Sequence, residues 1–161
     1  MTIRELMSTQ VQCVLSTVAE GAPSQHLMAY ALETTLTDVY IASRRSTRKI
    51  ANMLDNPSVS LLWDNRTGNT LDHEQGLAQM AEAQASQMKG WSRARVEHLL
   101  LERNPELAGV LSAGDSAVIA LRVRRFRLVQ GYDAVTTFIP GGPAEFLQQG
   151  SAHTEWSQMR C

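Results

Sequence analysis

The 161-residue sequence contains little cysteine, few aromatic residues and no excess of either charge. Its two cysteines, Cys13 and Cys161, are too few for a disulfide framework and stand at no metal-ligand spacing. We therefore expect a reducing, cytoplasmic location and no structural metal. A net charge of −1 provides no overall field for nucleic acid or an acidic membrane. The chain has no apolar run of about 20 residues. Residues 1–7 include Arg and Glu, so we expect neither a transmembrane helix nor a signal peptide.

What the sequence does contain is an ordinary globular mixture, with 43% hydrophobic and 19% charged residues. This length and composition suit one domain with its own core, which we expect over residues 1–139. Residues 140–161 are interrupted by Gly and Pro and are expected to form a tail, either poorly ordered or packed on a partner. The tail contains apolar residues without an obvious place in a monomeric core, namely Phe146, Leu147 and Trp156.

The most informative segment is residues 43–57, which reads as a short amphipathic helix. Ser46 is the predicted N-cap, and Asn56-Pro57 is the predicted end. The expected apolar face of the helix consists of Ile50, Met53 and Leu54. Residues 38–43 before it are a short β-rich run, so the segment lies at a junction between a strand and a helix.

Basic residues stand at the start of this helix, where its dipole disfavours them. The predicted first turn carries Thr47, Arg48 and Lys49, and Arg44 and Arg45 come just before it. Each cation costs about 0.3–1 kcal/mol in that position. An anion held by backbone N–H groups, hydroxyls and basic side chains explains the arrangement, which therefore predicts a phosphate site. The alternative is a set of solvated charges on a helix surface, and the number of converging donors favours the anion.

The rest of the pattern predicts an antiparallel barrel with accessory helices, because several strands occur without βαβ alternation. Strands are predicted at 11–19, 24–33, 39–43, 58–64 and 117–130, with one more in 131–139. A leading helix is expected within 2–10 and a long hairpin loop at 65–76. A further helix is expected from the N-cap Ser92 to Arg103, followed by a short one with Asn104 as N-cap and Pro105 in its first position. Residues 77–88 favour helix by propensity.

The strand at 117–130 contains a change of phase. Ile119, Leu121 and Val123 alternate on one face, but the next apolar residue is Phe126. A β-bulge at Arg124-Arg125 returns Val123 and Phe126 to the same face, so we predict one there.

Two stretches of the sequence resemble a known family. Residues 11–63 contain a strand, a Gly-x-Pro turn, two further strands and a Ser/Thr-x-x-x-Ser/Thr-Arg-Lys helix that ends in Asn-Pro. Residues 103–132 contain Asn-Pro-Glu-Leu-Ala and a strand ending Phe-Arg-Leu-Val-Gln-Gly-Tyr. This order resembles the pyridoxamine 5′-phosphate oxidase-like, FMN-binding split-barrel superfamily. The resemblance implies a six-stranded antiparallel split β-barrel that forms a homodimer with FMN at the subunit interface. It also implies a strand at 77–88, and we prefer that to the helix.

The resemblance assigns roles to seven residues and leaves Arg44 and Arg45 as alternatives. It implies that Thr47, Arg48 and Lys49 hold the flavin phosphate together with Ser43, and that His26, Leu27 and Met28 line the isoalloxazine. His26 stands where family members often have Arg, so Arg44 or Arg45 is the alternative source of that charge. His26 is either a flavin contact or a partly buried strand residue. The chain ends Trp-Ser-Gln-Met-Arg-Cys and lacks the Arg-Leu-x-Pro type of ending, so oxidation of pyridoxamine phosphate itself is not expected.

Two functions remain open at this level. The first is an FMN-dependent oxidoreductase that acts on a small molecule by hydride transfer, with its catalytic residues unidentified. The second is a non-catalytic flavin- or haem-binding protein for sensing, storage or delivery. The last long strand carries a basic stripe of Arg122, Arg124, Arg125 and Arg127. Binding of nucleic acid would need aromatic side chains among them for base stacking, and only Phe126 is near. The stripe therefore suits an exposed strand face or ion pairs in a dimer better.

Overall fold

The computed structural model describes residues 3–131, 134–140 and 147–149. Its long strands are β1 (Gln12–Ala19), β2 (Ala22–Ala29), β4 (Asp38–Arg44), β5 (Ser58–Asp64), β6 (Leu77–Gln87) and β7 (Ser116–Gln130). Shorter strands are β3 (Ala31–Leu32), β8 (Ala134–Phe138) and β9 (Leu147–Gln149). The helices are α1 (Ile3–Thr9), α2 (Arg48–Asp55), α3 (Asp72–Gln75), α4 (Gly90–Arg103) and α5 (Ala108–Leu111), with a 3₁₀ turn at Pro105–Leu107.

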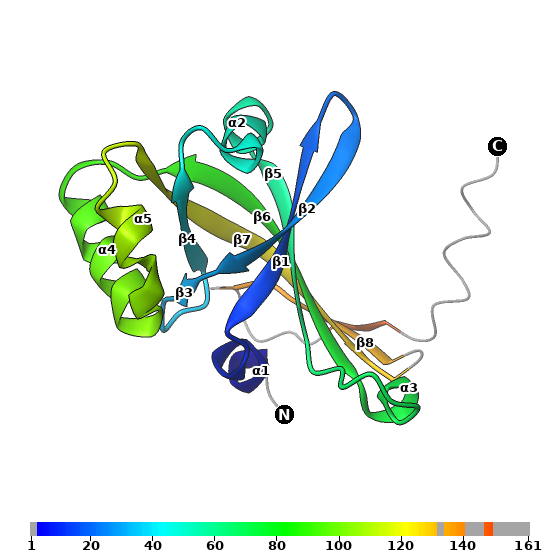
Figure 1. Ribbon diagram of the computed structural model, residues 1–161. Helices are drawn as coiled ribbons and strands as arrows, with labels where there is room; N and C mark the ends of the chain where they lie inside the picture. The colour runs from blue at the N-terminus through cyan, green and yellow to red at the C-terminus, as the bar shows by residue number, and fades with distance from the viewer. Residues whose placement is uncertain (1–2, 132–133, 141–146, 150–161) are drawn as a thin grey trace.

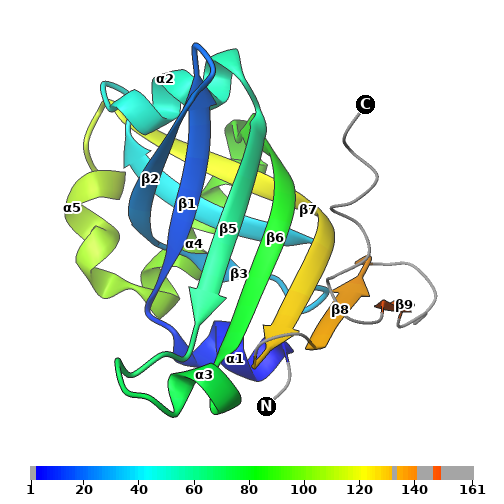
Figure 2. The same cartoon turned by 90° about the vertical axis from the view of Figure 1, so that its right-hand side faces the viewer.

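The strands form one antiparallel sheet that curls into a barrel (Figures 1 and 2). Its strand order is β2-β1-β5-β6-β7-β4-β3, and β8 and β9 extend from β7. The predicted antiparallel barrel with accessory helices is confirmed. Within the described residues the sheet has nine strands instead of six, because the short β3, β8 and β9 join the six long ones.

The barrel closes through a bend in one predicted strand. The prediction of a single strand at 24–33 was wrong, since Tyr30 interrupts it between β2 and β3. β2 pairs with β1, whereas Ala31 and Leu32 of β3 pair with β4 on the opposite edge of the sheet. The same run of chain therefore joins both edges.

The main core fills the barrel, and its largest fully buried side chains include Trp63, Tyr30 and Phe126. A second, smaller core lies outside the barrel, where Val96 and Leu100 of α4 pack on Tyr40 and Val118. Figure 1 shows α4 and α5 beside β4, with α2 at one end of the barrel and α1 at the other. Helices thus cover the ends of the barrel. No labelled helix lies over the outer side of β1, β5 and β6, which is toward the viewer in Figure 2.

The strand at β6 confirms the expectation from the resemblance, and the helix favoured by propensity is wrong. Alternate residues Leu77, Gln79, Ala81 and Ala83 are buried, which is the period-two pattern of a strand. The buried Gln79 at one of these positions obscures the alternation in the sequence. Tertiary pairing with β5 and β7 overrides the helical preference of Ala, Gln and Glu.

The predicted bulge in β7 is also confirmed. Glu82 of β6 pairs with Arg125 and its neighbour Ala83 pairs with Val123, so Arg124 is the extra residue. Val123 and Phe126 are both buried in the main core. Arg124 and Arg125 consequently both point to the outer face and are exposed.

Helix α4 begins at Gly90 with Lys89 as N-cap, so the predicted N-cap Ser92 is wrong. The Ser92 hydroxyl donates instead to the Lys89 carbonyl oxygen at 2.8 Å, a bond within the first turn. The predicted end at Arg103 is confirmed, and Asn104-Pro105 begins the 3₁₀ turn as expected. The buried Asn104 side chain does not cap that turn, because it donates to the Tyr30 carbonyl oxygen at 2.9 Å.

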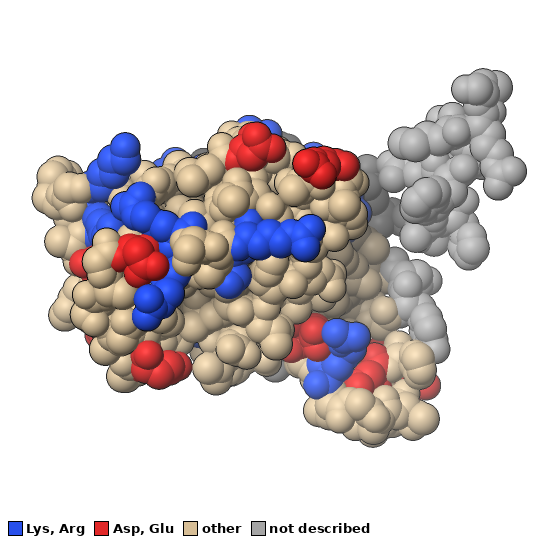
Figure 3. Space-filling view, turned by 45° about the horizontal axis from the view of Figure 1, so that its top comes forward, with Lys and Arg blue, Asp and Glu red and all other residues tan. Residues whose placement is uncertain are grey.

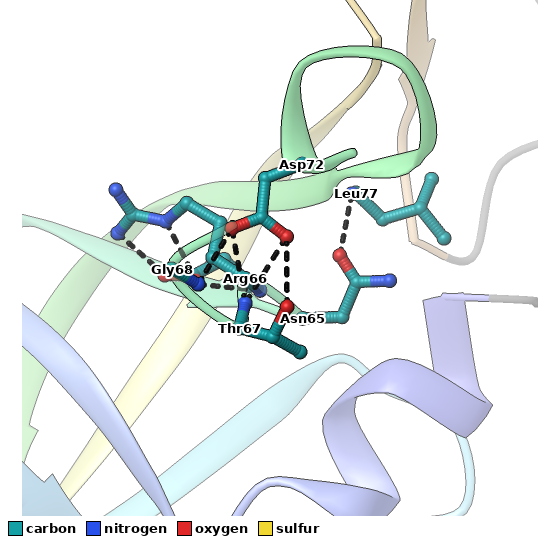
Figure 4. A network of polar contacts seen from close by, with 7 residues as sticks. Asn65, Arg66, Thr67, Gly68, Asp72 and Leu77 are labelled. Atoms are coloured by element: carbon teal, nitrogen blue, oxygen red, sulfur yellow. Dashed lines mark hydrogen bonds and ion pairs between the residues drawn. The ribbon is translucent and has the colours of Figure 1, made fainter. Parts of the chain in front are cut away.

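The predicted loop between β5 and β6 contains α3 and is organised by one carboxylate (Figure 4). Asp72 accepts backbone N–H groups from Thr67, Gly68 and Asn69, at 2.7 to 3.2 Å. These bonds, that of Thr67 first, lower the pKa of Asp72. Gly76 ends α3, and a Cβ there would lie 2.3 Å from the Asp72 carbonyl oxygen, so the position requires glycine.

Among the described residues, no helix is both long and apolar enough to cross a membrane. The domain boundary predicted at residue 139 stays a prediction. β8 confirms the extra strand expected within 131–139, and β9 continues the sheet beyond it. Phe146, Trp156 and Cys161 lie outside the described residues.

Candidate functional site

The candidate site begins where β4 ends and α2 starts. The helix begins at Arg48 with Thr47 as N-cap, so the predicted N-cap Ser46 is wrong by one residue. The reason is a tight turn before the helix: the Thr47 backbone N–H and hydroxyl both donate to the Arg44 carbonyl oxygen, at 3.1 and 2.8 Å. The Thr47 hydroxyl also lies 3.2 Å from that of Ser43, which is buried at the end of β4. Two hydroxyls are therefore held together beside the helix N-terminus.

The start of α2 has no internal cap. The Thr47 side chain makes no capping bond, and no acidic residue stands in the first turn. The Thr47 carbonyl oxygen accepts the N–H groups of Ile50 and Ala51, so those of Arg48 and Lys49 precede the first helical bonds. Figure 3 views this end of the molecule obliquely and shows Lys and Arg side chains on it. N–H groups and cations together make an anion-binding helix end.

The Arg48 and Lys49 side chains form no hydrogen bond or ion pair with other described residues. Arg48 is exposed and Lys49 is half-buried. Their positive charges act instead on His26, whose pKa is lowered first by burial and then by Lys49 and Arg48. β2 thus brings His26 next to α2, and these three residues form one basic group in which the histidine favours its neutral form.

His26 is held by a buried polar chain that runs from β2 through β1 to α2. Its Nε2 lies 3.2 Å from the Thr17 hydroxyl, and that hydroxyl accepts the Asn52 side-chain amide at 2.9 Å. Thr17 and Asn52 are both buried. Because the Thr17 hydroxyl accepts a hydrogen bond from Asn52, its own O–H is able to donate to Nε2 of a neutral His26. Nδ1 then carries the imidazole proton and is the remaining donor.

Thr17 and Asn52 were missed by the sequence reasoning. The sequence feature that indicates Asn52 is a polar residue between Ile50 and Met53, on the inward side of a short amphipathic helix. The buried face of α2 consists of Ile50, Asn52 and Met53. Leu54, which we predicted on that face, is 61% exposed. The prediction that Leu54 belongs to the apolar face was therefore wrong.

Arg44 and Arg45 are engaged by neighbouring elements. Arg44 lies 3.4 Å from the Asp115 carboxylate, and the Arg45 backbone N–H donates to the Asp115 carbonyl oxygen at 2.7 Å. With the amide oxygen of Gln87 turned toward it, the Arg45 guanidinium donates two bonds at 2.8 and 3.1 Å. These contacts fix the turn before α2 against β6 and the start of β7. Neither residue is tied to His26, and a role for them at the phosphate stays a prediction.

The three β2 residues assigned to the flavin do not share one face. Met28 is buried in the main core, whereas Leu27 is 69% exposed on the outer side of the sheet. The structure brings His26, Ser43, Thr47, Arg48 and Lys49 together around the start of α2. The Leu27 side chain lies on the opposite face of the sheet from His26 and is not part of that group.

Other candidate groups stay outside the site. His98 is exposed on α4. Burial raises the pKa of the Cys13 thiol to about 12, so it is held as an unreactive core residue. No cluster of three or more His, Cys, Asp or Glu side chains suited to a metal ion occurs in the described part of the chain.

The family model described as pyridoxamine 5′-phosphate oxidase matches residues 2–130 of the chain. No curated protein matches it. Among solved structures, a haem-binding protein from Mycobacterium smegmatis is similar at 19% identity and a TM-score of 0.75, over 84% of this chain. The chain spans only 55% of that protein.

Two further structures are similar along most of their own length. The haem storage protein of Vibrio cholerae has 20% identity and a TM-score of 0.67, over 86% of this chain and 92% of that one. General stress protein 26 of Bacillus anthracis has 22% identity and a TM-score of 0.60, over 91% and 95%. At these identities the similarity shows the shared fold.

Proposed function

Since the chain belongs to the pyridoxamine 5′-phosphate oxidase family, we propose that it binds FMN with the flavin phosphate at the N-terminus of α2. The observation that carries this proposal is the pair Arg48 and Lys49, which form no hydrogen bond or ion pair with other described residues and are the first two residues of an uncapped helix. The Ser43 and Thr47 hydroxyls, 3.2 Å apart, supply further donors. This donor set fits a phosphate dianion, which prefers charge-assisted bonds and backbone N–H groups.

The residues of the chain bind and orient the cofactor in this proposal. FMN, when bound, supplies the redox chemistry. In the tautomer that accepts from Thr17, His26 keeps an Nδ1 proton to donate, and the Thr17–Asn52 chain holds its ring in place. The finer proposal is an oxidoreductase that acts on a small molecule. Consumption of NADH or NADPH by the flavin-loaded protein in air tests for turnover.

A second candidate is haem binding without turnover. It is favoured by two proteins of similar structure, one a haem-binding protein and the other a haem storage protein. The absorption spectrum of the purified protein separates the two cofactors, because flavin and haem absorb at different wavelengths. A Soret band in place of the flavin bands favours the second candidate.

The proposed assembly is a homodimer with the cofactor at the subunit interface. Exposed apolar side chains on the outer side of the sheet support it, notably Leu27 (69% exposed) and Met80 (37%). Leu27 is the predicted flavin contact that faces outward. In this proposal the second subunit covers the flavin on that side of the sheet. Light scattering at micromolar concentration checks the assembly, and a monomer mass contradicts it. The cytoplasmic location stays a prediction from cysteine use.

The phosphate site is tested with Lys49→Ala. Each charge-assisted contact contributes about 1.5–3 kcal/mol, so FMN affinity falls roughly tenfold to a hundredfold. Riboflavin, which lacks the phosphate, binds both proteins equally. Arg127→Ala is the control, because Arg127 is an exposed cation on β7 that forms no ion pair with other described residues. Flavin fluorescence quenching measures the FMN and riboflavin affinities of all three proteins. Unchanged FMN affinity in Lys49→Ala, or an equal loss in Arg127→Ala, overturns the assignment.

A further inference from the structure

The bulge in β7 divides the basic stripe of that strand into two pairs. Arg122 and Arg124 line a cavity of about 670 Å³ between the outer faces of β4, β7 and β6 and the start of α4. Arg125 and Arg127 line a separate cavity of about 200 Å³ on the outer side of β5, β6 and β7. An unbroken strand would not point Arg124 and Arg125 to the same face. The extra residue therefore places both pairs on the outer face of the sheet.

Each pair contains one anchored and one unpaired arginine. Arg122 donates from Nε to the buried Asp38 carboxylate at 2.6 Å, and Arg125 lies 3.3 Å from the exposed Glu82. Arg124 and Arg127 form no hydrogen bond or ion pair with other described residues. The bond to Asp38 fixes the direction of Arg122, which leaves its two terminal nitrogens able to donate elsewhere.

The larger cavity has a positive balance of charge. Its lining contains three basic side chains, Lys89, Arg122 and Arg124, and one carboxylate, Asp38, which Arg122 already occupies. Lys89 forms no ion pair within the described residues. The volume lies within the range of small-ligand pockets, about 300–1,000 Å³. Ala85 and Ala120 contribute only small side chains to the lining.

We propose that this cavity binds a small polyanion, whose phosphate or carboxylate oxygens are held by Arg124 and Lys89 against the fixed Arg122. The smaller cavity does not meet the same conditions. Its lining holds Glu82, which is exposed beside the two arginines, and its volume is below the range for such a ligand. The site is separate from the start of α2 and does not depend on the proposed flavin.

The test is a titration of the ¹⁵N-labelled full chain with pyrophosphate and, separately, with citrate at constant ionic strength. Backbone amide shifts report where each probe binds. We expect shifts at residues that line the cavity, such as Ser86, Lys89 and Ala120. The two probes distinguish phosphate from carboxylate as the preferred group, and saturable shifts at these residues with either one support the site.

Arg124→Gln is the informative variant, because the side chain is exposed and its loss leaves the core unchanged. It should weaken binding at least tenfold, in line with the loss of a charge-assisted bond. Arg127→Gln is the matched control, since Arg127 is exposed and unpaired among the described residues of the same strand; it should bind as the wild type. The proposal is overturned by an equal loss in both variants, by unchanged binding in Arg124→Gln, or by shifts only around Arg48 and Lys49.

Discussion

The guanidinium of Arg103 lies 4.7 Å from the centroid of the Tyr30 ring. Its Nη2 also donates to the carbonyl oxygens of Met7 and Gln10, at 3.0 and 2.9 Å. The Tyr30 hydroxyl donates to the Gln10 carbonyl oxygen at 2.9 Å. Arg103 therefore joins the end of α4 to the end of α1 and to the bend that separates β2 from β3. Because that bend closes the barrel, the contact also fixes the strand that carries His26.

Replacing Arg103 by Ala should lower the free energy of unfolding by about 2–3 kcal/mol, because several carbonyl oxygens lose a charged donor and the cation–π contact is lost. Arg103→Lys keeps the charge without the planar fork and should recover part of the loss. Urea unfolding followed by circular dichroism measures both. Arg127→Ala, at an exposed arginine, serves as control and should stay within about 0.5 kcal/mol of wild type. A loss in Arg103→Ala no larger than in the control contradicts this role.

The parts of the fold that the sequence predicted are those set by local patterns. The alternation on either side of Arg124 located the bulge, because the inward face of a strand has to be apolar on both sides of it. The cations before and within α2 located the candidate phosphate site, because their position conflicts with the helix dipole.

The parts that it did not predict depend on contacts far apart in the chain. Asn52 is buried because Thr17 of β1 accepts its amide, and nothing near Asn52 in the sequence reports that partner. The break at Tyr30 depends on both edges of the sheet meeting there. β6 required the family resemblance, since its small and polar residues favour helix until β5 and β7 pair with them.

Deleting Arg124 should leave the fold intact. The deletion removes the residue that has no partner opposite it on β6, so Val123 and Phe126 keep their inward faces and the pairing on both sides of the bulge is retained. Deleting Arg127 instead should disrupt the end of β7, because every later residue changes face and the pairing with β8 is lost. Thermal unfolding monitored by circular dichroism compares the two. Equal damage from both deletions contradicts the one-residue bulge.

The buried pair Thr17 and Asn52 should show strong coupling. Thr17→Val keeps the shape but leaves the Asn52 amide nitrogen without its acceptor, which costs about 1–3 kcal/mol. The double variant Thr17→Val/Asn52→Leu leaves no buried donor, so its loss should be smaller than the sum of the two single losses. Urea unfolding of the three variants gives the coupling energy. Additive losses mean that the hydrogen bond does not join these residues in solution.

His26 should report both pH and ligand. Its pKa in the folded chain lies below the ordinary value of 6.5, first because of burial and then because of Lys49 and Arg48. The unfolded chain therefore binds the proton more tightly. The stability that neutral His26 contributes is present above pH 6.5, and it is lost as the pH falls from 6.5 toward the folded pKa. His26→Gln lacks this dependence, so wild type should lose more stability than the variant between pH 8 and 5.

An FMN phosphate beside Lys49 and Arg48 offsets their charges and should raise the His26 pKa. The imidazole proton resonance, followed by NMR with and without FMN, measures the shift, and the exposed His98 provides a reference resonance on α4. If FMN binds but leaves the His26 pKa unchanged, its phosphate does not lie at the start of α2.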